Sequence, residues 1–240
     1  LGLGYNEDLM TQLAYKSDGS HYFAESANEL AGVFDSELGR ALSVVAQEIQ
    51  IKIKCAQGIR PIRLLGREGR IEEQNVEVFI NQLYSKHEKF IMLEVEVPGT
   101  DRGHKRKIAA VNVSYSNLKT HTTDRLGSQV EVDFSNSEEL IERQTNHNVM
   151  ADVIELIATE RNELALKLRD KGEMKQACEL LFENEVYLKD NAVRYDSQKL
   201  KKYAEQQIED RDNMDEANWT RRRKIMREQQ FKNKSQQGTK

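Results

Sequence analysis

The sequence predicts a multi-module α+β protein of 240 residues, with a partial α/β segment (1–45), an antiparallel β-sandwich (46–134) and a helical module with a charged tail (135–240). Three observations support this prediction. Strand-like and helix-like stretches alternate in the first segment, apolar residues recur at every second position in the middle one, and they recur at helical spacing in the last.

The first segment has the strand, helix, strand, helix order of a parallel α/β sheet. We expect a buried strand to end at residues 1–4, Asn6 to cap a helix, residues 21–24 to form a short strand, and Ser26 to cap a second helix. The apolar residues of these helices are Leu9, Met10, Leu13 and Ala14, and then Leu30, Val33, Phe34, Leu38 and Leu42. Because two strands do not make a stable parallel sheet, we expect the rest of the sheet upstream of Leu1 and exposed apolar surface on residues 1–45.

The middle segment alternates apolar and polar residues, as half-buried antiparallel strands do. Ile49, Ile51, Ile53 and Cys55, for example, alternate with polar side chains. Further strand-like runs lie at 62–65, 76–81, 91–97, 108–115 and 129–134. Five to seven short strands separated by turns are typical of a β-sandwich.

The last segment predicts a helical hairpin followed by tail helices. Acidic residues after Ser137 favour a helix start, Gly172 ends that helix, and a second helix covers about 173–192. In the charged tail, Trp219 is expected to anchor the last helix, and residues from Phe231 onward are expected to fray.

The opening residues resemble the C-terminal end of a von Willebrand factor type A (VWA) domain. The stretches that carry the resemblance are LGLGYNEDLMTQLA, SDGSHYFAES and ANELAGVFDSELG. The whole chain resembles the C-terminal half of a bacterial VWA protein, in which a β-rich segment follows the domain as in inter-alpha-trypsin-inhibitor heavy chains. Residues 1–45 would then be the remnant of the VWA domain.

The resemblance also implies a metal site outside this sequence. VWA domains bind Mg²⁺ at a metal-ion-dependent adhesion site whose Asp-x-Ser-x-Ser loop, Thr and Asp would all precede Leu1. We therefore expect no metal or cofactor ligand here, and Mg²⁺ only in an intact parent domain.

Composition and motifs argue against several classes of protein. The net charge of −4 gives no general attraction to nucleic acid, and no apolar run reaches the length of a membrane-spanning helix. Cys55 and Cys178 are expected to be separate free thiols. Gly-x-Ser-x-Gly, Walker, His-Glu-x-x-His and Cys-x-x-Cys motifs are absent, and the five histidines are scattered. We therefore expect no enzyme and no catalytic residue.

The candidate partner contacts are Trp219, Arg221, Arg222, Arg223 and Lys224, which include the most basic run of the chain. Such a run binds a partner or forms the solvated side of an amphipathic helix, with the upstream acidic residues offsetting its charge. The two readings stay open at this point.

The function expected from these features is protein interaction of the adhesion type, with the ligand bound by the VWA domain and the sandwich and helices acting as scaffold. The alternative is an accessory module of an assembly or chaperone system, since residues 168–177 resemble one turn of a tetratricopeptide repeat. Either function implies a protein partner of unknown identity and no specific nucleic acid. The compartment stays open, with a periplasmic or cell-surface location favoured over the cytoplasm because VWA proteins of this layout are often exported.

Overall fold

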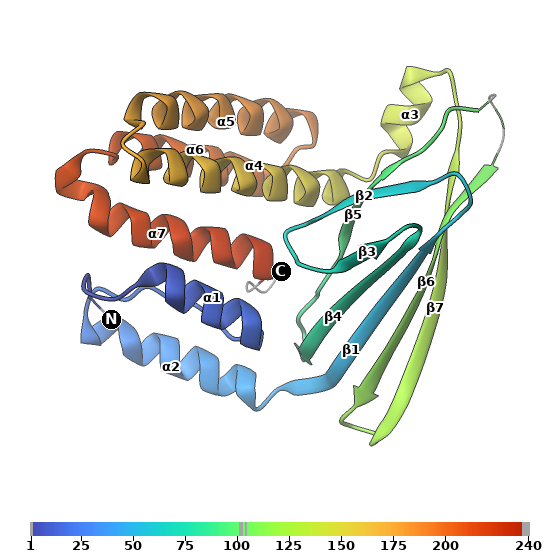
Figure 1. Cartoon of the computed structure of the whole chain (residues 1–240), viewed down its shortest axis with the longest axis horizontal. Coiled ribbons are helices and arrows are strands. Elements are labelled where there is room, and N and C mark those ends of the chain that lie inside the picture. Colours follow the sequence, from blue (N-terminus) through green and yellow to red (C-terminus); the bar gives the residue numbers. More distant parts are fainter. Residues whose placement is uncertain (1, 101–102, 104, 237–240) are drawn as a thin grey trace. The chain divides into compact units, whose positions relative to one another are not determined.

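The computed structural model describes residues 2–100, 103 and 105–236, leaving aside the side chains of residues 36, 40 and 41 (Figure 1). These residues fall into two compact units. The first combines residues 2–36 with 146–236, and the second covers the described residues between 37 and 145. The predicted segments 1–45 and 135–240 therefore contribute most of their residues to the same unit, and the β-rich segment is inserted between them in the sequence.

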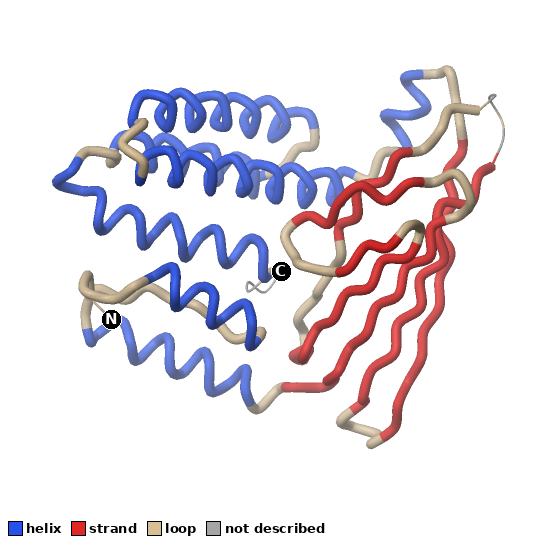
Figure 2. Tube along the Cα trace, viewed as in Figure 1, coloured by secondary structure: helices blue, strands red, loops and turns tan. Residues whose placement is uncertain are grey.

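The inserted unit is built on antiparallel strands (Figure 2). Its larger sheet has the strand order β3-β4-β1-β6-β7, and its smaller sheet pairs β2 with β5. The strands are β1 (Val44–Cys55), β2 (Arg60–Leu65), β3 (Arg70–Glu72), β4 (Asn75–Tyr84), β5 (Met92–Glu96), β6 (Lys105–Asn117) and β7 (Thr122–Asp133).

The core of this unit lies between its two sheets. Ile53 of β1 faces Val76 of β4 and Val111 of β6 across the larger sheet. Leu64 of β2 and Leu93 of β5 pack against the same buried cluster from the smaller sheet. The predicted β-sandwich is confirmed, because the residues at alternate positions of β1 are the ones that enter this core.

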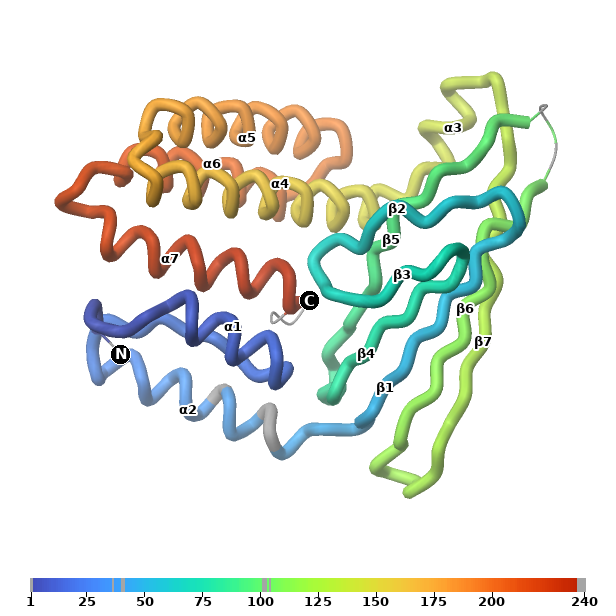
Figure 3. Tube along the Cα trace, in the orientation of Figure 1, coloured from blue at the N-terminus to red at the C-terminus, as the bar shows by residue number. Residues whose placement is uncertain are grey.

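The other unit is helical. Its elements are α1 (Glu7–Ser17), the first part of α2 (Ala27–Ala41), α4 (His147–Asp170), α5 (Met174–Arg194), α6 (Gln198–Asp212) and α7 (Glu216–Ser235). In Figure 3, α4, α5 and α6 lie side by side, and α7 lies between α4 and α1. The predicted helical hairpin is α4–α5, and α6 and α7 are the predicted tail helices.

The hairpin's first helix is shorter than the sequence suggested. Residues 138–171 form two helices, α3 (Glu138–Gln144) and α4, because Thr145 is extended and Asn146 starts a new helix by accepting a hydrogen bond from the Val149 N–H (3.2 Å).

The predicted strands at 1–4 and 21–24 are wrong for the described residues. Leu1 lies outside them, residues 3–5 bend, and residues 21–24 form no ladder. The two segments meet through one hydrogen bond, in which the Gly2 N–H donates to the Ala24 oxygen (2.8 Å). Strand structure needs a repeated ladder with a neighbour, and no described strand lies beside these segments.

The predicted fraying from Phe231 is also wrong as far as Gln236, and residues 237–240 lie outside the described part. Phe231 is fully buried, and its ring packs against Tyr15 (4.7 Å between centroids) and His21 (5.8 Å). These contacts hold the last turns of α7 in place.

Candidate interaction surface

The charged side of helix α1 faces α7. Asn6 caps the helix by accepting a hydrogen bond from the Leu9 N–H (3.0 Å), which places Glu7 and Asp8 in the first turn on the face toward α7. Glu7 is buried, with 6% of its surface exposed. A carboxylate this deeply buried needs charged partners, and α7 supplies them.

The charge cluster between α1 and α7 uses the predicted basic run. Lys224 and Arg223 both donate to the Glu7 carboxylate. Arg223 also donates to Asp8 (2.6 Å) and Asp170 (2.8 Å), and the Lys224 Nζ donates to the Tyr5 carbonyl (2.7 Å).

The pKa values in this cluster follow its geometry. Burial favours a raised pKa for Glu7, but hydrogen bonds from Lys224 and Arg223 outweigh it and hold that pKa below its ordinary value. Burial opposes the charged form of Arg223, and its three acidic partners raise the pKa of the guanidinium nonetheless. The cluster is therefore ionised at neutral pH and joins the two ends of the described chain.

The remaining predicted contact residues are also engaged within the chain. Arg221 donates to Glu25, and Arg222 forms a buried ion pair with Asp210 (2.6 Å). Trp219 packs against an apolar cluster of the helical bundle, as predicted, and Arg169 lies over its ring at 5.1 Å. The structure thus places all five residues of the set in internal contacts, and of the four basic ones Arg221 keeps the most exposed side chain.

A buried polar network connects the four helices α4 to α7. The Asn162 amide donates to Gln207 (3.0 Å) and to Asp210 (2.8 Å). Asn184 donates to the same Gln207 oxygen (2.9 Å), and Gln230 donates to the Asn162 oxygen (2.7 Å). The network fixes the register of the helices. Sequence reasoning missed it, although Asn162, Asn184 and Gln207 occupy core-facing positions of their helices.

The outward side of α1 is apolar. Leu9 and Leu13 are 55% and 60% exposed, and Met10 is also exposed. Phe34 and Leu38 of α2 and Leu42 just after it are exposed as well, whereas Leu30 and Val33 are half-buried. The expected exposed apolar surface of residues 1–45 is therefore confirmed. We call Leu9, Met10, Leu13 and Phe34 the apolar surface of the first unit.

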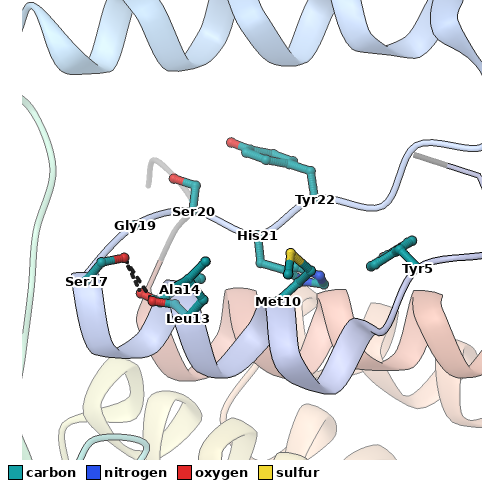
Figure 4. A pocket seen from close by; sticks show the side chains of 9 residues that line it. All are labelled: Tyr5, Met10, Leu13, Ala14, Ser17, Gly19, Ser20, His21 and Tyr22. Carbon is teal, nitrogen blue, oxygen red and sulfur yellow. Dashed lines mark hydrogen bonds between the residues drawn. The ribbon is translucent and has the colours of Figure 1, made fainter.

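An open pocket of about 340 Å³ adjoins this surface. Figure 4 shows Met10, Leu13 and Ala14 along α1 on one side and the segment from Gly19 to Tyr22 on the other. Ser17 is held at the end of the helix, where its hydroxyl donates to the Leu13 carbonyl (2.9 Å).

His21, a pocket residue, is buried, with 4% of its surface exposed. Burial, followed by the nearby charge of Lys232, lowers the pKa of its imidazole. A neutral ring beside apolar side chains suits van der Waals contact better than acid–base chemistry.

Possible metal ligands and cysteine thiols are dispersed in the described part of the chain. Within it, no three His, Cys, Asp or Glu side chains lie together in a way that would hold a metal ion. Cys55 is buried and Cys178 is half-buried, and both are free thiols, as predicted. None of the helices in the described ranges combines the length and apolar character that a membrane crossing requires.

Comparison with known proteins shows the fold. No protein-family model and no curated protein sequence matches the chain. The crystal structure of the ArnB paralog VWA2 from Sulfolobus acidocaldarius is similar over 97% of this chain and 53% of that chain, with 15% identity and a TM-score of 0.54. The von Willebrand factor type A protein from Catenulispora acidiphila is similar over 81% of this chain and 46% of that one, with 11% identity and a TM-score of 0.62.

These likenesses show that the chain has a VWA-like fold, which confirms the predicted resemblance at that level. The chain spans about half the length of each of the two proteins. The match to VWA2 includes residues of both compact units, since it extends over 97% of the chain.

Proposed function

We propose that this chain is part of a non-enzymatic protein-interaction protein of the VWA type. The observation that carries the proposal is the reversed polarity of α1, whose Glu7 carboxylate is buried against α7 while Leu9 and Leu13 face outward. An amphipathic helix normally buries its apolar side. Its exposed side is therefore a surface for contact with another polypeptide segment.

The covering segment, in this proposal, is the sheet of a VWA domain supplied by polypeptide outside this sequence. The VWA-like fold and the half-length match to both solved structures support it. The metal-ion-dependent adhesion site, its Mg²⁺ and the ligand would belong to that segment, and the sandwich and helices described here would act as scaffold.

Site-specific photo-crosslinking tests the contact surface. A benzophenone amino acid at Leu13 is expected to crosslink to the covering segment, whereas the same group at the exposed neighbour Gln12 is expected to crosslink far less. Equal crosslinking at the two positions would contradict the proposal.

Calorimetric titration with Mg²⁺ tests the metal-dependent part. The 240-residue chain is expected to give no binding isotherm, and a longer product containing the covering segment is expected to bind one Mg²⁺. Failure of the longer product to bind Mg²⁺ would rule out the adhesion site. The crosslinking experiment would still decide separately whether α1 is a contact surface.

The alternative, an accessory module that recruits a partner through its C-terminal helices, is favoured by one feature of α5. Phe182, Val186 and Val193 are exposed at 55%, 42% and 84% and share one side of the helix. A partner helix would cover such a stripe. Phe182→Ser is expected to abolish partner recovery under this alternative and to leave it unchanged if α1 carries the interaction.

A further inference from the structure

Strand β7 leaves a long edge open in the larger sheet. It pairs with β6 over its whole length, and none of the described strands pairs with its other side. Eleven of its twelve residues are exposed, and it contains neither Pro nor Lys. The opposite edge strand, β3, has three residues. Edge strands are usually kept short or protected by Pro, Lys or a covering segment, so β7 is available for pairing.

The inner side of β7 continues the apolar face of the sandwich. Leu126 lies opposite Val113, and Val130 lies opposite Ala109, so both project to the side on which the core lies. Leu126 is nonetheless 60% exposed and Val130 is 45% exposed. The buried clusters of this unit include no β7 residue. The apolar face thus extends beyond the part that the smaller sheet covers.

The sequence of β7 is complementary to itself. When two antiparallel copies are related by a two-fold axis at Ser128, Leu126 of each copy faces Val130 of the other on the inner side. On the outer side, Arg125 of each copy faces Glu131 of the other. Each pair occurs twice because of the symmetry. Directly opposed apolar side chains and opposite charges are the pairs that stabilise antiparallel strands.

One neighbouring register lacks this match, and the other forms a similar match farther from the axis. With the axis at Gly127, Leu126 faces Ser128 and Arg125 faces Gln129. With the axis at Gln129, Leu126 faces Val132 and Arg125 faces Asp133, but Val130 faces Ser128 and Glu131 faces Gly127. The axis at Ser128 places the apolar and the charged pairs nearest to the axis, and the trapping experiment below distinguishes the two registers.

We propose that two copies of this chain associate through β7 in this register and form one continuous sheet. The proposal rests on the sandwich unit alone and is independent of the proposed function.

A charge-swap series tests the pairing. Arg125→Glu and Glu131→Arg are each expected to weaken dimerisation about tenfold, since each change places like charges opposite each other twice. The double variant R125E/E131R is expected to return the dissociation constant to within about threefold of the unchanged chain. Sedimentation equilibrium measures the constants, and thermal unfolding checks that each variant folds.

Disulfide trapping tests the register. Ser128→Cys in a Cys178→Ser background is expected to give a disulfide-linked dimer, because directly opposed Cα atoms lie about 4.5–5.5 Å apart and a disulfide spans about 4.4–6.8 Å. Gly127→Cys and Gln129→Cys are expected to stay reduced, since those positions meet their own copies only diagonally, at roughly 7–8 Å. A Cβ at Gly127 meets no atom closer than 3.5 Å, so this control is sterically tolerated.

Two results would overturn the proposal. The first is a chain that stays monomeric at high micromolar concentration without any crosslink at residue 128. The second is a dimer whose constant is indifferent to the Arg125 and Glu131 changes, because such a dimer uses another surface, such as α1 or α5.

Discussion

At the level of single residues, the buried pair Asp210–Arg222 shows how the helical unit handles charge in its core. Both side chains are almost fully buried, 2.6 Å apart, and Asn162 donates a further hydrogen bond to Asp210. Burial raises the pKa of Asp210 to about 6, while Arg222 and Asn162 act in the opposite direction. The carboxylate therefore depends on its partners to stay ionised at neutral pH.

Removing one partner of this pair is expected to lower the free energy of unfolding. Asp210→Asn leaves Arg222 as a buried charge without a counter-ion, and we expect the free energy of unfolding to fall by about 3 kcal/mol. Asp212→Asn, at an exposed position of the same helix, is expected to change it by less than about 0.5 kcal/mol. Urea denaturation at pH 7.5 measures both. Equal effects of the two substitutions would show that the buried pair contributes nothing.

His21 makes a different prediction, about pH. Its pKa in the folded chain lies below the unfolded value of 6.5, so the unfolded chain binds the proton more readily. The stabilising contribution of the neutral ring is complete above about pH 6.5 and is lost as the pH falls toward the folded pKa.

Replacing the ring isolates this contribution. We expect the unfolding free energy of the unchanged chain to fall more steeply between pH 7.5 and 5.5 than that of the His21→Phe variant. Asp210 titrates in the same range with the opposite sign, but it is present in both proteins and cancels in the difference. Parallel curves for the two proteins would contradict the assignment.

At the level of elements, the turn before β3 lies very close to β4 at Gly69, where the backbone carries no Cβ. A Cβ on Gly69 would lie 2.8 Å from the Glu77 carbonyl oxygen and 2.9 Å from Val78. Both distances are shorter than van der Waals contact allows. Gly69→Ala must therefore shift the backbone next to the sandwich core.

We expect Gly69→Ala to lower the free energy of unfolding by about 1–3 kcal/mol. Gly99→Ala is the matched control, because a Cβ at Gly99 meets no atom within 4 Å. Thermal unfolding followed by circular dichroism compares them. If Gly99→Ala lowered the stability and Gly69→Ala did not, the close approach at Gly69 would not be the cause of the effect.

The elements predicted best from the sequence are those whose apolar residues recur with a clear period. Alternation identified β1 because Ile49, Ile53 and Cys55 all enter the core. The break at Thr145 was missed because apolar periodicity continues across it, and only the cap at Asn146 marks it. The strand expected at 21–24 was wrong because a strand depends on a neighbour that a local pattern does not reveal.

The internal contacts of the candidate contact residues were not foreseen for a related reason. A run of four basic residues at 221–224 looks solvated in the sequence, yet Lys224 is 2% exposed. Its partner Glu7 is 217 positions away, and no local signal connects the two. The burial of Asn162 was likewise not predicted, because an amide side chain is polar and a search for apolar periodicity passes over it. Apolar exposure on α1 was foreseen, although the strands at 1–4 and 21–24 from which it was inferred do not form in the described residues.

At the level of the whole molecule, the sandwich has its own core and lies between the two parts of the helical unit in sequence. We expect residues 43–135 alone to fold, with a β-type circular dichroism spectrum and a cooperative thermal transition. In the same fragment, Val76→Asp is expected to abolish the transition, because Val76 is fully buried. A fragment without cooperative unfolding would show that the helical unit is required.

The charge cluster that joins α1 to α7 has a consequence for biosynthesis. A nascent chain acquires the sandwich soon after residue 135 is made, whereas α1 waits for about ninety further residues before Arg223 and Lys224 exist. During that interval the charged side of α1 is without its partners on α7. The helical unit therefore completes its fold last.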